Sequence, residues 1–292
     1  MMRRFYFSLF CCFILWMGSA IHIGEAEQKK FPLKVHFIDV GQGDSIFIQT
    51  PNRKTILIDG GPPEAGKTVI HYLQKQGVTE IDLIIATHPD IDHIGGLLHV
   101  LEKIPVKFIV DSGKFHATKT YFQYVTQIRE QMIPVQVAKE KEKISIDPLL
   151  DIKVLNTTGK IKTNNQSSIV LHIKYDDSEL LLTGDIDRFQ EKRIRKKYNI
   201  KSDILKVAHH GSKTSSTMSF LKEVDPQITI LTYDIGNDFG HPHKKVIQNL
   251  NKIDTTIYST AVYGNIILYT EGSEYMIDIE KSPVEALQEK TN

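Results

Sequence analysis

The sequence Thr87-His88-Pro89-Asp90-Ile91-Asp92-His93 places two imidazoles and two carboxylates within six residues. An apolar run over 81–86 precedes it and predicts a buried strand, and Gly95-Gly96 followed by leucines predicts a helix just beyond it. His and Asp side chains together suit divalent ions such as Zn²⁺ or Mn²⁺. Four potential ligands at the end of a strand therefore predict a metal site. A surface loop with incidental polar residues is the alternative, and it explains the alternation poorly.

Further polar residues follow later predicted strands. The cluster Thr183-Gly184-Asp185 comes directly after the apolar run 180–182. An isolated Asp at a strand end is usually a cap or a turn residue, but beside another polar strand end it becomes a candidate carboxylate between two cations. Four histidines in two such loops predict at least one more ligand, and the residues alone leave open which one it is. These histidines are His209, His210, His241 and His243.

The order of apolar patterns predicts an α/β fold. A β-meander is expected first, and strand–helix units follow it, so two sheets with helices outside them would bury the apolar faces. Helices are predicted over 67–76, 97–103, 120–131, 188–198 and 244–252. Strands are predicted over 33–40, 44–49, 55–58, 81–86, 107–110, 136–138, 152–155, 169–175, 179–183, 204–208 and 228–231, near Ile257, and over 266–269. One domain is expected over 27–282, with a loosely ordered tail over 283–292.

The N-terminus has the pattern of a secretory signal peptide. A basic head, Met1–Arg4, precedes an apolar run over 5–18, and small residues follow it. We expect residues 1–26 to be a signal peptide, cleaved after Ala26 or Ala20, and the protein to be secreted. An uncleaved anchor that faces the outside is the alternative. With the signal cleaved, no stable membrane span is expected.

Composition narrows the possible chemistry. Both cysteines, Cys11 and Cys12, lie in the N-terminal apolar segment, so the mature chain would hold a metal only through His, Asp, Glu or Asn. The net charge is +1, which gives no overall attraction to nucleic acid. The basic residues over 192–197 are interpreted as the solvated face of a helix. The oligomeric state is left open.

Seven motifs in order resemble those of metallo-β-lactamase-fold hydrolases, and most of all the metallohydrolase domain of ComEC-type DNA-uptake competence proteins. They lie at 36–44, 59–61, 88–96, 164–168, 182–185, 209–212 and 240–243. The resemblance spans about residues 33 to 270. It implies a four-layer αββα sandwich and a site for two divalent metal ions, Mn²⁺ or Zn²⁺.

The resemblance also implies a role for individual residues. His88 and Asp90 would hold one metal, and Asp185 would bridge to the second. Asp59 would brace the metal loop from behind. A late histidine would complete the second metal; His210 is favoured, with His241 or His243 as alternatives. The implied metal ligands are His88, Asp90, Asp92, His93, Asp185 and His210.

Two departures from the wider superfamily bear on the metal. Asp90 stands where the usual motif has His, and an oxygen ligand there favours Mn²⁺ over Zn²⁺. The usual lone His between the metal loop and the bridging Asp is not evident, because His172 lies within a strand and Asn164 or Asn165 is nearer the expected place. We therefore expect the first metal to be weakly held and to arrive with substrate.

The expected reaction is hydrolysis by a hydroxide that two metals generate from water. Asp92 would orient this hydroxide, and His209 or His243 would protonate the leaving oxygen. The expected substrate contacts are Asn164, Asn165, Ser212, Lys213 and His241.

Three functions are weighed. The first is a secreted phosphodiesterase or nuclease that acts on DNA. The second is a hydrolase of a small extracellular ester, lactone or lactam. The third, a binding protein with a decayed site, conflicts with the intact ligands. A basic groove beside the metals would favour the first function, and a narrow apolar pocket would favour the second.

Overall fold

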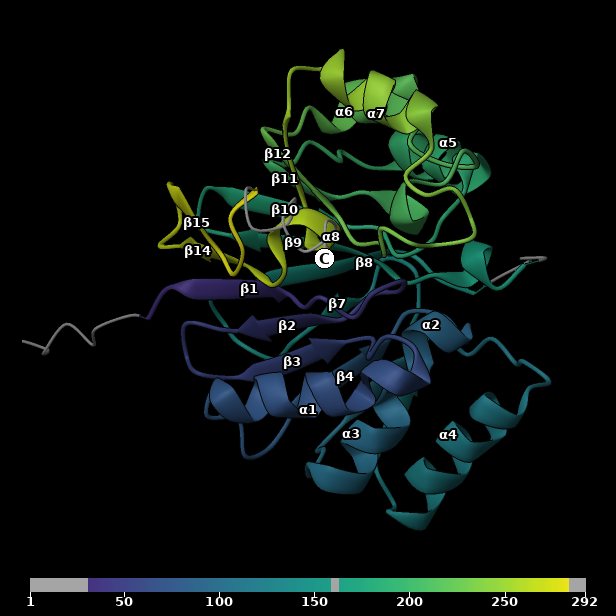
Figure 1. The fold of residues 1–292 in the computed structure, drawn as a ribbon. Helices are drawn as coiled ribbons and strands as arrows, with labels where there is room; N and C mark the ends of the chain where they lie inside the picture. Colours follow the sequence, from purple (N-terminus) through teal and green to yellow (C-terminus); the bar gives the residue numbers. More distant parts are fainter. Residues whose placement is uncertain (1–30, 159–162, 284–292) are drawn as a thin grey trace, which may run out of the picture. The chain divides into compact units, whose positions relative to one another are not determined.

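Two β-sheets face each other and bury a core between them in the computed structural model, which describes residues 31–158 and 163–283 (Figure 1). Apolar side chains from both sheets form this core, among them Phe37 and Ile58 from one sheet and Leu171 and Ile204 from the other. The predicted signal peptide lies outside the described residues, as does all but the first residue of the predicted tail. No helix within the described ranges combines the length and apolar character that a membrane crossing requires.

The first sheet has the order β15-β14-β1-β2-β3-β4-β5-β6, and the second has the order β13-β12-β11-β10-β9-β8-β7. The strands of the first sheet are β1 Leu33–Phe37, β2 Ile46–Gln49, β3 Thr55–Ile58, β4 Leu83–Ala86, β5 Ile109–Asp111, β6 Val135–Val137, β14 Ile266–Thr270 and β15 Tyr275–Ile279. Those of the second are β7 Lys143–Ile144, β8 Asp151–Asn156, β9 Val170–Tyr175, β10 Ser178–Leu182, β11 Ile204–Lys206, β12 Ile228–Leu231 and β13 Thr256–Ser259.

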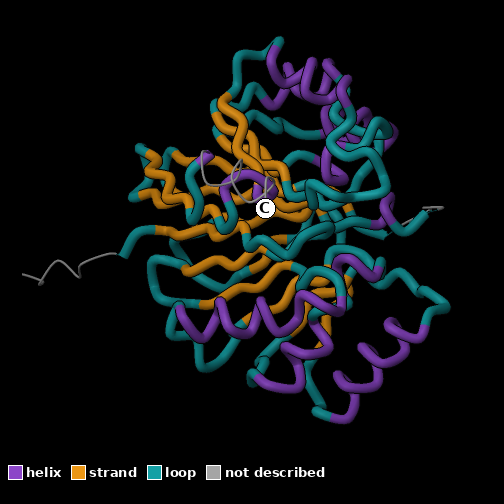
Figure 2. The backbone as a smooth tube through the Cα atoms, viewed as in Figure 1, coloured by secondary structure: helices purple, strands orange, loops and turns teal. Residues whose placement is uncertain are grey.

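Helices cover the outer face of each sheet (Figure 2). On α1, for example, Val69, Tyr72 and Leu73 recur at helical spacing and are buried against the first sheet. The helices beside the first sheet are α1 Gly66–Lys75, α2 Ile91–Ile94, α3 Leu97–Lys103 and α4 Lys119–Glu130. Those beside the second are α5 Arg188–Lys197, α6 Met218–Val224 and α7 Lys244–Asn251, and α8 Thr260–Tyr263 follows β13. This arrangement confirms the predicted four-layer αββα sandwich.

Parallel strands bring distant loops together. Strands β3 to β6 run parallel in the first sheet, and β10 to β13 run parallel in the second. The carboxyl ends of parallel strands lie at one edge of a sheet, which is where α/β folds place their sites. The loops that leave β4, β10, β11 and β12 carry the polar residues singled out above.

Some predicted element bounds shift, and two strands were missed. Strand β4 begins at Leu83, and Ile81 forms only an isolated bridge with Val106. The antiparallel pairing of β1 to β3 agrees with the expected meander. Strands β7 and β15 were not predicted, because both are edge strands with half-exposed side chains and show little apolar contrast.

Close backbone packing fixes the start of α3 against the end of β3. A Cβ atom added to Gly96 would lie 1.9 Å from the carbonyl oxygen of Gly60, and one added to Gly60 would lie 2.7 Å from the amide nitrogen of Leu97. The Gly60 amide donates to the His93 carbonyl at 2.7 Å, and the Gly96 amide donates to the Gly61 carbonyl at 2.8 Å. Glycine is required here because the two backbones touch.

We predict that Gly96→Ala lowers the free energy of unfolding by about 1–3 kcal/mol, because the new methyl group must push the two backbones apart. Denaturant unfolding followed by circular dichroism measures this change. Gly236→Ala is the matched control, since a Cβ added at Gly236 would have its nearest neighbour at 3.7 Å, an ordinary contact distance. Equal stability of the two variants would show that this contact is not the constraint.

Candidate metal centre

Asp59 holds the loop after β4 from behind. Its carboxylate accepts hydrogen bonds from the Thr87 amide at 2.8 Å and from the Thr87 hydroxyl at 2.6 Å. The same carboxylate lies 2.8 Å from Nδ1 of His93. When Nδ1 donates its hydrogen to Asp59, the lone pair of Nε2 is left free to bind a metal and points away from Asp59.

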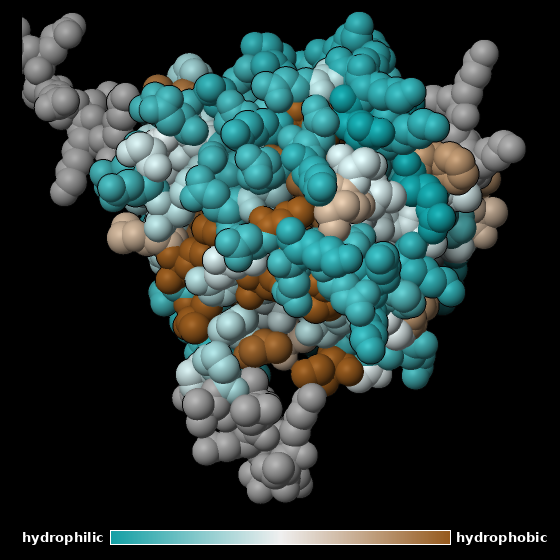
Figure 3. Space-filling model, turned by 90° about the horizontal axis from the view of Figure 1, so that it is seen from above, coloured by the Kyte–Doolittle hydropathy of each residue, from teal (hydrophilic) through white to brown (hydrophobic). Residues whose placement is uncertain are grey.

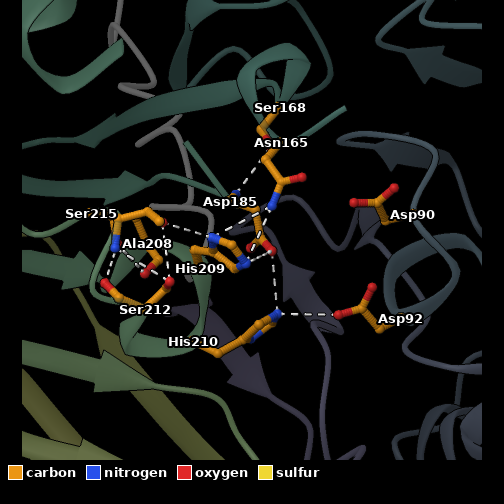
Figure 4. A network of polar contacts seen from close by, with 12 residues as sticks. Asp90, Asp92, Asn165, Ser168, Asp185, Ala208, His209, His210, Ser212 and Ser215 are labelled. Carbon is orange, nitrogen blue, oxygen red and sulfur yellow. Dashed lines mark hydrogen bonds and ion pairs between the residues drawn. The ribbon is translucent and has the colours of Figure 1, made fainter. Parts of the chain in front are cut away.

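Four side chains that follow three different strands converge on one point. Asp92, His93, Asp185 and His210 each offer a donor atom, and all four atoms lie within 4.8 Å of one another. Nε2 of His210 lies 3.4 Å from both Asp92 and Asp185 (Figure 4). Nε2 of His93 lies 3.4 Å from Asp185. All but Asp92 are buried.

The free atoms of this cluster fit a divalent metal. Nε2 of His93, Nε2 of His210 and Oδ1 of Asp185 are buried, and each is without a hydrogen-bond partner within the described part of the chain. Buried polar atoms of native proteins nearly always have a partner. Imidazole nitrogens and carboxylate oxygens that point at one place are the usual donors for Zn²⁺ and Mn²⁺.

His88 and Asp90 lie beside the cluster and offer a second donor pair. Nε2 of His88 is 3.4 Å from Asp90, is buried, and has no hydrogen-bond partner among the residues that the structure covers. The rings of His88 and His93 are 4.0 Å apart. Asp90 also accepts a 2.6 Å hydrogen bond from the amide nitrogen of Asn164. This pair has fewer donors than the neighbouring cluster, and the weak binding of a first metal stays a prediction.

Asp44 is a functional residue that the sequence reasoning missed. It is buried between Nζ of Lys206, at 3.0 Å, and Nδ1 of His210, at 3.5 Å, and it accepts a hydrogen bond from the Thr232 hydroxyl. The Thr232 carbonyl lies 2.8 Å from the same His210 nitrogen. The Thr232 carbonyl therefore does for His210 what Asp59 does for His93, and Asp44 adds a charged contact to the same nitrogen and holds the Thr232 hydroxyl. The signal was present, since Asp44 closes the motif at 36–44 and Lys206 is a charge within an apolar strand.

His209 and Asn165 border the cluster. Nε2 of His209 lies 3.7 Å from Asp185 and 3.3 Å from the side-chain nitrogen of Asn165 (Figure 4). His209 and His210 both have positive φ, 51° and 52°, in the tight turn after β11. The ring of His241 is 5.4 Å from that of His209, and its Nδ1 is buried without a partner in the described structure.

Other predicted residues make different contacts. His243 is exposed, and its Nδ1 accepts a hydrogen bond from the Lys245 amide, so its imidazole caps α7. Ser212 is buried, and its hydroxyl accepts from the Thr214 side chain at 3.1 Å. His172 contacts Glu179 at 3.1 Å on the second sheet. The structure thus gives Ser212 and His243 roles in their own loops, because backbone amides and hydroxyls of those loops take up their polar atoms.

Charges within the cluster set its protonation. Burial lowers the pKa of His210, but Asp185 and Asp44 outweigh burial and raise this pKa to about 10. Burial raises the pKa of Asp185, and the imidazoles of His210 and His93 outweigh it and hold the pKa well below its usual value. For His241, burial and the nearby His209 lower the pKa to about 4. Without metal, the cluster therefore holds protons on imidazoles between ionised carboxylates.

The chain matches a known protein family over most of its length. Residues 38–232, which include the whole donor cluster, match the metallo-beta-lactamase superfamily. The chain belongs to this superfamily. As a metallo-β-lactamase superfamily hydrolase, it has the donors that divalent metal ions require in the cluster described above.

Competence proteins are among its relatives. The chain is 30% identical over 274 residues to ComE operon protein 3 of Bacillus subtilis, and the match covers 88% of this chain and 35% of the relative. It is 27% identical over 248 residues to Recombination protein 2 of Haemophilus influenzae, with 82% and 29% covered. The chain thus spans about a third of the length of these relatives. The predicted resemblance to ComEC-type proteins is confirmed.

Solved structures support the fold. The metallo-beta-lactamase fold protein YhfI of Bacillus subtilis matches with a TM-score of 0.51 at 15% identity, covering 85% of this chain and 100% of that protein. CmlA, a diiron beta-hydroxylase of Streptomyces venezuelae, matches with a TM-score of 0.55 at 12% identity, covering 82% and 54%. At these identities the likeness concerns the fold alone.

We predict that Asp185→Ala abolishes stoichiometric metal binding, and that Asp59→Asn weakens metal affinity by roughly 10–100-fold, because the His93 imidazole loses its orienting partner. Metal content after dialysis, measured by mass spectrometry, and titration calorimetry test both variants. Asp177→Ala, in the exposed turn between β9 and β10, is the control. Full metal content in Asp185→Ala would exclude this cluster as the site.

We predict that metal uptake releases protons and that metal affinity rises with pH. The carboxylates raise the pKa of His210 to about 10, so its imidazole is protonated at pH 7 before metal binds. A metal binds only the neutral imidazole, so the proton must leave. Adding Mn²⁺ or Zn²⁺ to protein in weak buffer at pH 7 should acidify the solution. No release in the wild type, with metal bound, would contradict this protonation.

Proposed function

We propose that this chain is a secreted, metal-dependent phosphodiesterase that hydrolyses DNA. The observation that carries the proposal is the convergence of unpartnered imidazole nitrogens and carboxylate oxygens at the carboxyl ends of parallel strands. The substrate class is supported by relatives named for competence and recombination, which match most of this chain.

The residues of the site have separate tasks in this proposal. When bound, two divalent metals supply a water of lowered pKa and stabilise the charge that develops on phosphorus-bound oxygen. Asp92, half-exposed at the cluster, orients the attacking water. His209, whose Nε2 lies 3.7 Å from Asp185 at the border of the cluster, is the proposed proton donor to the leaving oxygen. Burial lowers the pKa of His209, and the charge of Asp185 opposes this shift. Asn164 and Asn165 contact the substrate from the opposite loop.

The metal is proposed to be Mn²⁺ rather than Zn²⁺. Asp90 gives the His88 side of the site an oxygen donor, and harder oxygen donors favour Mn²⁺. Without Cys in the mature chain, no thiolate is present to favour Zn²⁺. Secretion through residues 1–26 is part of the same proposal and rests on their sequence pattern.

We predict that the purified chain from residue 27, stripped of metal and resupplied with Mn²⁺, cleaves linear DNA, and that Asp185→Ala lowers the rate at least about 1,000-fold because the metal donor is lost. Single-stranded and double-stranded substrates are compared on gels, with Zn²⁺ in parallel. Asp177→Ala is expected to cleave like the wild type, since its side chain lies in an exposed turn.

The negative outcome is equally informative. If the wild type binds metal and cleaves no DNA under either ion, the nuclease proposal fails, and a panel of small esters, lactones and lactams becomes the next substrate set. DNA cleavage that persists in Asp185→Ala would point to a contaminating nuclease.

A further inference from the structure

A basic hollow lies among α6, α7 and the loop 213–217, outside the group of Asp92, His93, Asp185 and His210, which we call the metal cluster. Its volume is about 690 Å³. Five cationic side chains from several elements line it: Arg188, Lys213, Lys222, Lys245 and Lys252. The end of the molecule that carries α6 and α7 presents a largely hydrophilic surface (Figure 3). We refer to this feature as the basic hollow.

The elements around the basic hollow hold its cations in place. Lys245, Asn249 and Lys252 recur at helical spacing and share one face of α7 and its C-terminal cap. The side chain of Asn249 donates to the Ser216 carbonyl at 3.1 Å, which ties α7 to the loop. Arg188 opens α5, and its guanidinium donates to the Lys213 carbonyl at 3.1 Å.

The cations of the basic hollow are not neutralised. In the described residues, none of the five takes part in an ion pair. Arg193 and Lys197 on α5 behave differently, because both bind Glu140, at 2.8 and 2.6 Å. Glu191, which packs under the loop, is fully buried, and amides and a hydroxyl of Ser216 and Thr217 engage its carboxylate. The hollow therefore concentrates positive charge in a chain whose net charge is only +1.

A short loop connects the basic hollow to the metal cluster. Only two residues separate the ligand His210 from Lys213, so their Cα atoms lie within roughly 11 Å of each other. Nδ1 of His209 lies 3.2 Å from the Thr214 hydroxyl in the same loop. On the other side, a Cβ added to Gly211 would lie 2.6 Å from Cβ of Pro242, so this loop packs against the one that leads into α7.

We propose that the basic hollow binds backbone phosphates of the DNA strand whose cleaved bond lies at the metal cluster. The inference rests on the proposed function and adds a substrate-positioning site to it. Lys and Arg contacts to phosphates give affinity and register without reading sequence. A concave surface between two helices fits a flexible strand better than it fits a flat bilayer.

The test measures binding rather than turnover. A fluorescein-labelled single-stranded 20-mer with phosphorothioate linkages resists cleavage, and its anisotropy reports binding to the metal-loaded full chain between about 50 and 200 mM salt. We expect Lys245→Gln/Lys252→Gln to weaken binding roughly tenfold at the lowest salt. The slope of log K against log salt should fall in magnitude by about 1.4, since each phosphate contact on a single strand contributes about 0.7.

Lys192→Gln/Lys196→Gln is the matched control. It removes the same charge from exposed positions on α5 and should keep the affinity and the salt slope of the wild type. Thermal melting confirms that both variants fold, since all four lysines are exposed. Equal weakening in both variants would mean that overall charge alone drives binding, and it would overturn the proposal.

Other outcomes would also overturn it. Displacement of the 20-mer from the wild type by millimolar inorganic phosphate would reduce the hollow to a small-anion site. Binding to phosphatidylglycerol vesicles that depends on Lys245 and Lys252, without binding to DNA, would make it a membrane surface. If the hollow binds DNA and the chain cleaves none, this inference stands and the nuclease proposal fails. If cleavage occurs and both variants bind alike, only this inference fails.

Discussion

The carboxylate of Asp59 is the contact on which the geometry of the metal cluster depends. It is buried at the end of β3, and it accepts hydrogen bonds from the amide and hydroxyl of Thr87 while it also binds Nδ1 of His93. One side chain thereby sets both the path of the loop after β4 and the orientation of His93, a candidate metal ligand. This is possible only because Gly60 and Gly96 let the two backbones touch. The same contacts at the end of β3 therefore fix both the packing of the backbone and the orientation of His93.

A second buried carboxylate, that of Asp44, contacts residues of the second sheet. Asp44 lies between Lys206 and His210, and both cationic partners are buried with it. Isolated charges in the interior are costly, and a charge pair with further hydrogen bonds reduces that cost. Asp44 lies in the loop between β1 and β2 of the first sheet, and Lys206 lies in β11 of the second, so this pair links the two sheets beside the cluster. Asp59 orients His93, and the Thr232 carbonyl orients His210, so that both imidazoles approach Asp185 to 3.4 Å.

The loop after β11 carries both histidines of the metal cluster region and the first cation of the basic hollow. His209 and His210 point toward the metal cluster, while Lys213 begins the basic hollow. In the proposed function, one turn would carry both a metal ligand and cations that contact phosphates of a strand extending beyond the cleaved bond. The remaining basic residues of α5 behave as a solvated helix face, in which Glu140 neutralises Arg193 and Lys197.

The sequence by itself determined the order of most strands and helices and the set of polar strand ends, because apolar periodicity and motif spacing are local properties. It named Asp92, His93, Asp185 and His210 before their convergence was visible. It did not reveal the ion pair of Asp44 and Lys206, because these two residues lie more than a hundred positions apart in the chain. The residues alone did not separate His210, which joins the cluster, from His243, which caps α7, and only the family resemblance favoured His210. Only the tertiary structure decided these points and gathered the cations of the basic hollow, since packing between sheets and helices sets which distant side chains meet.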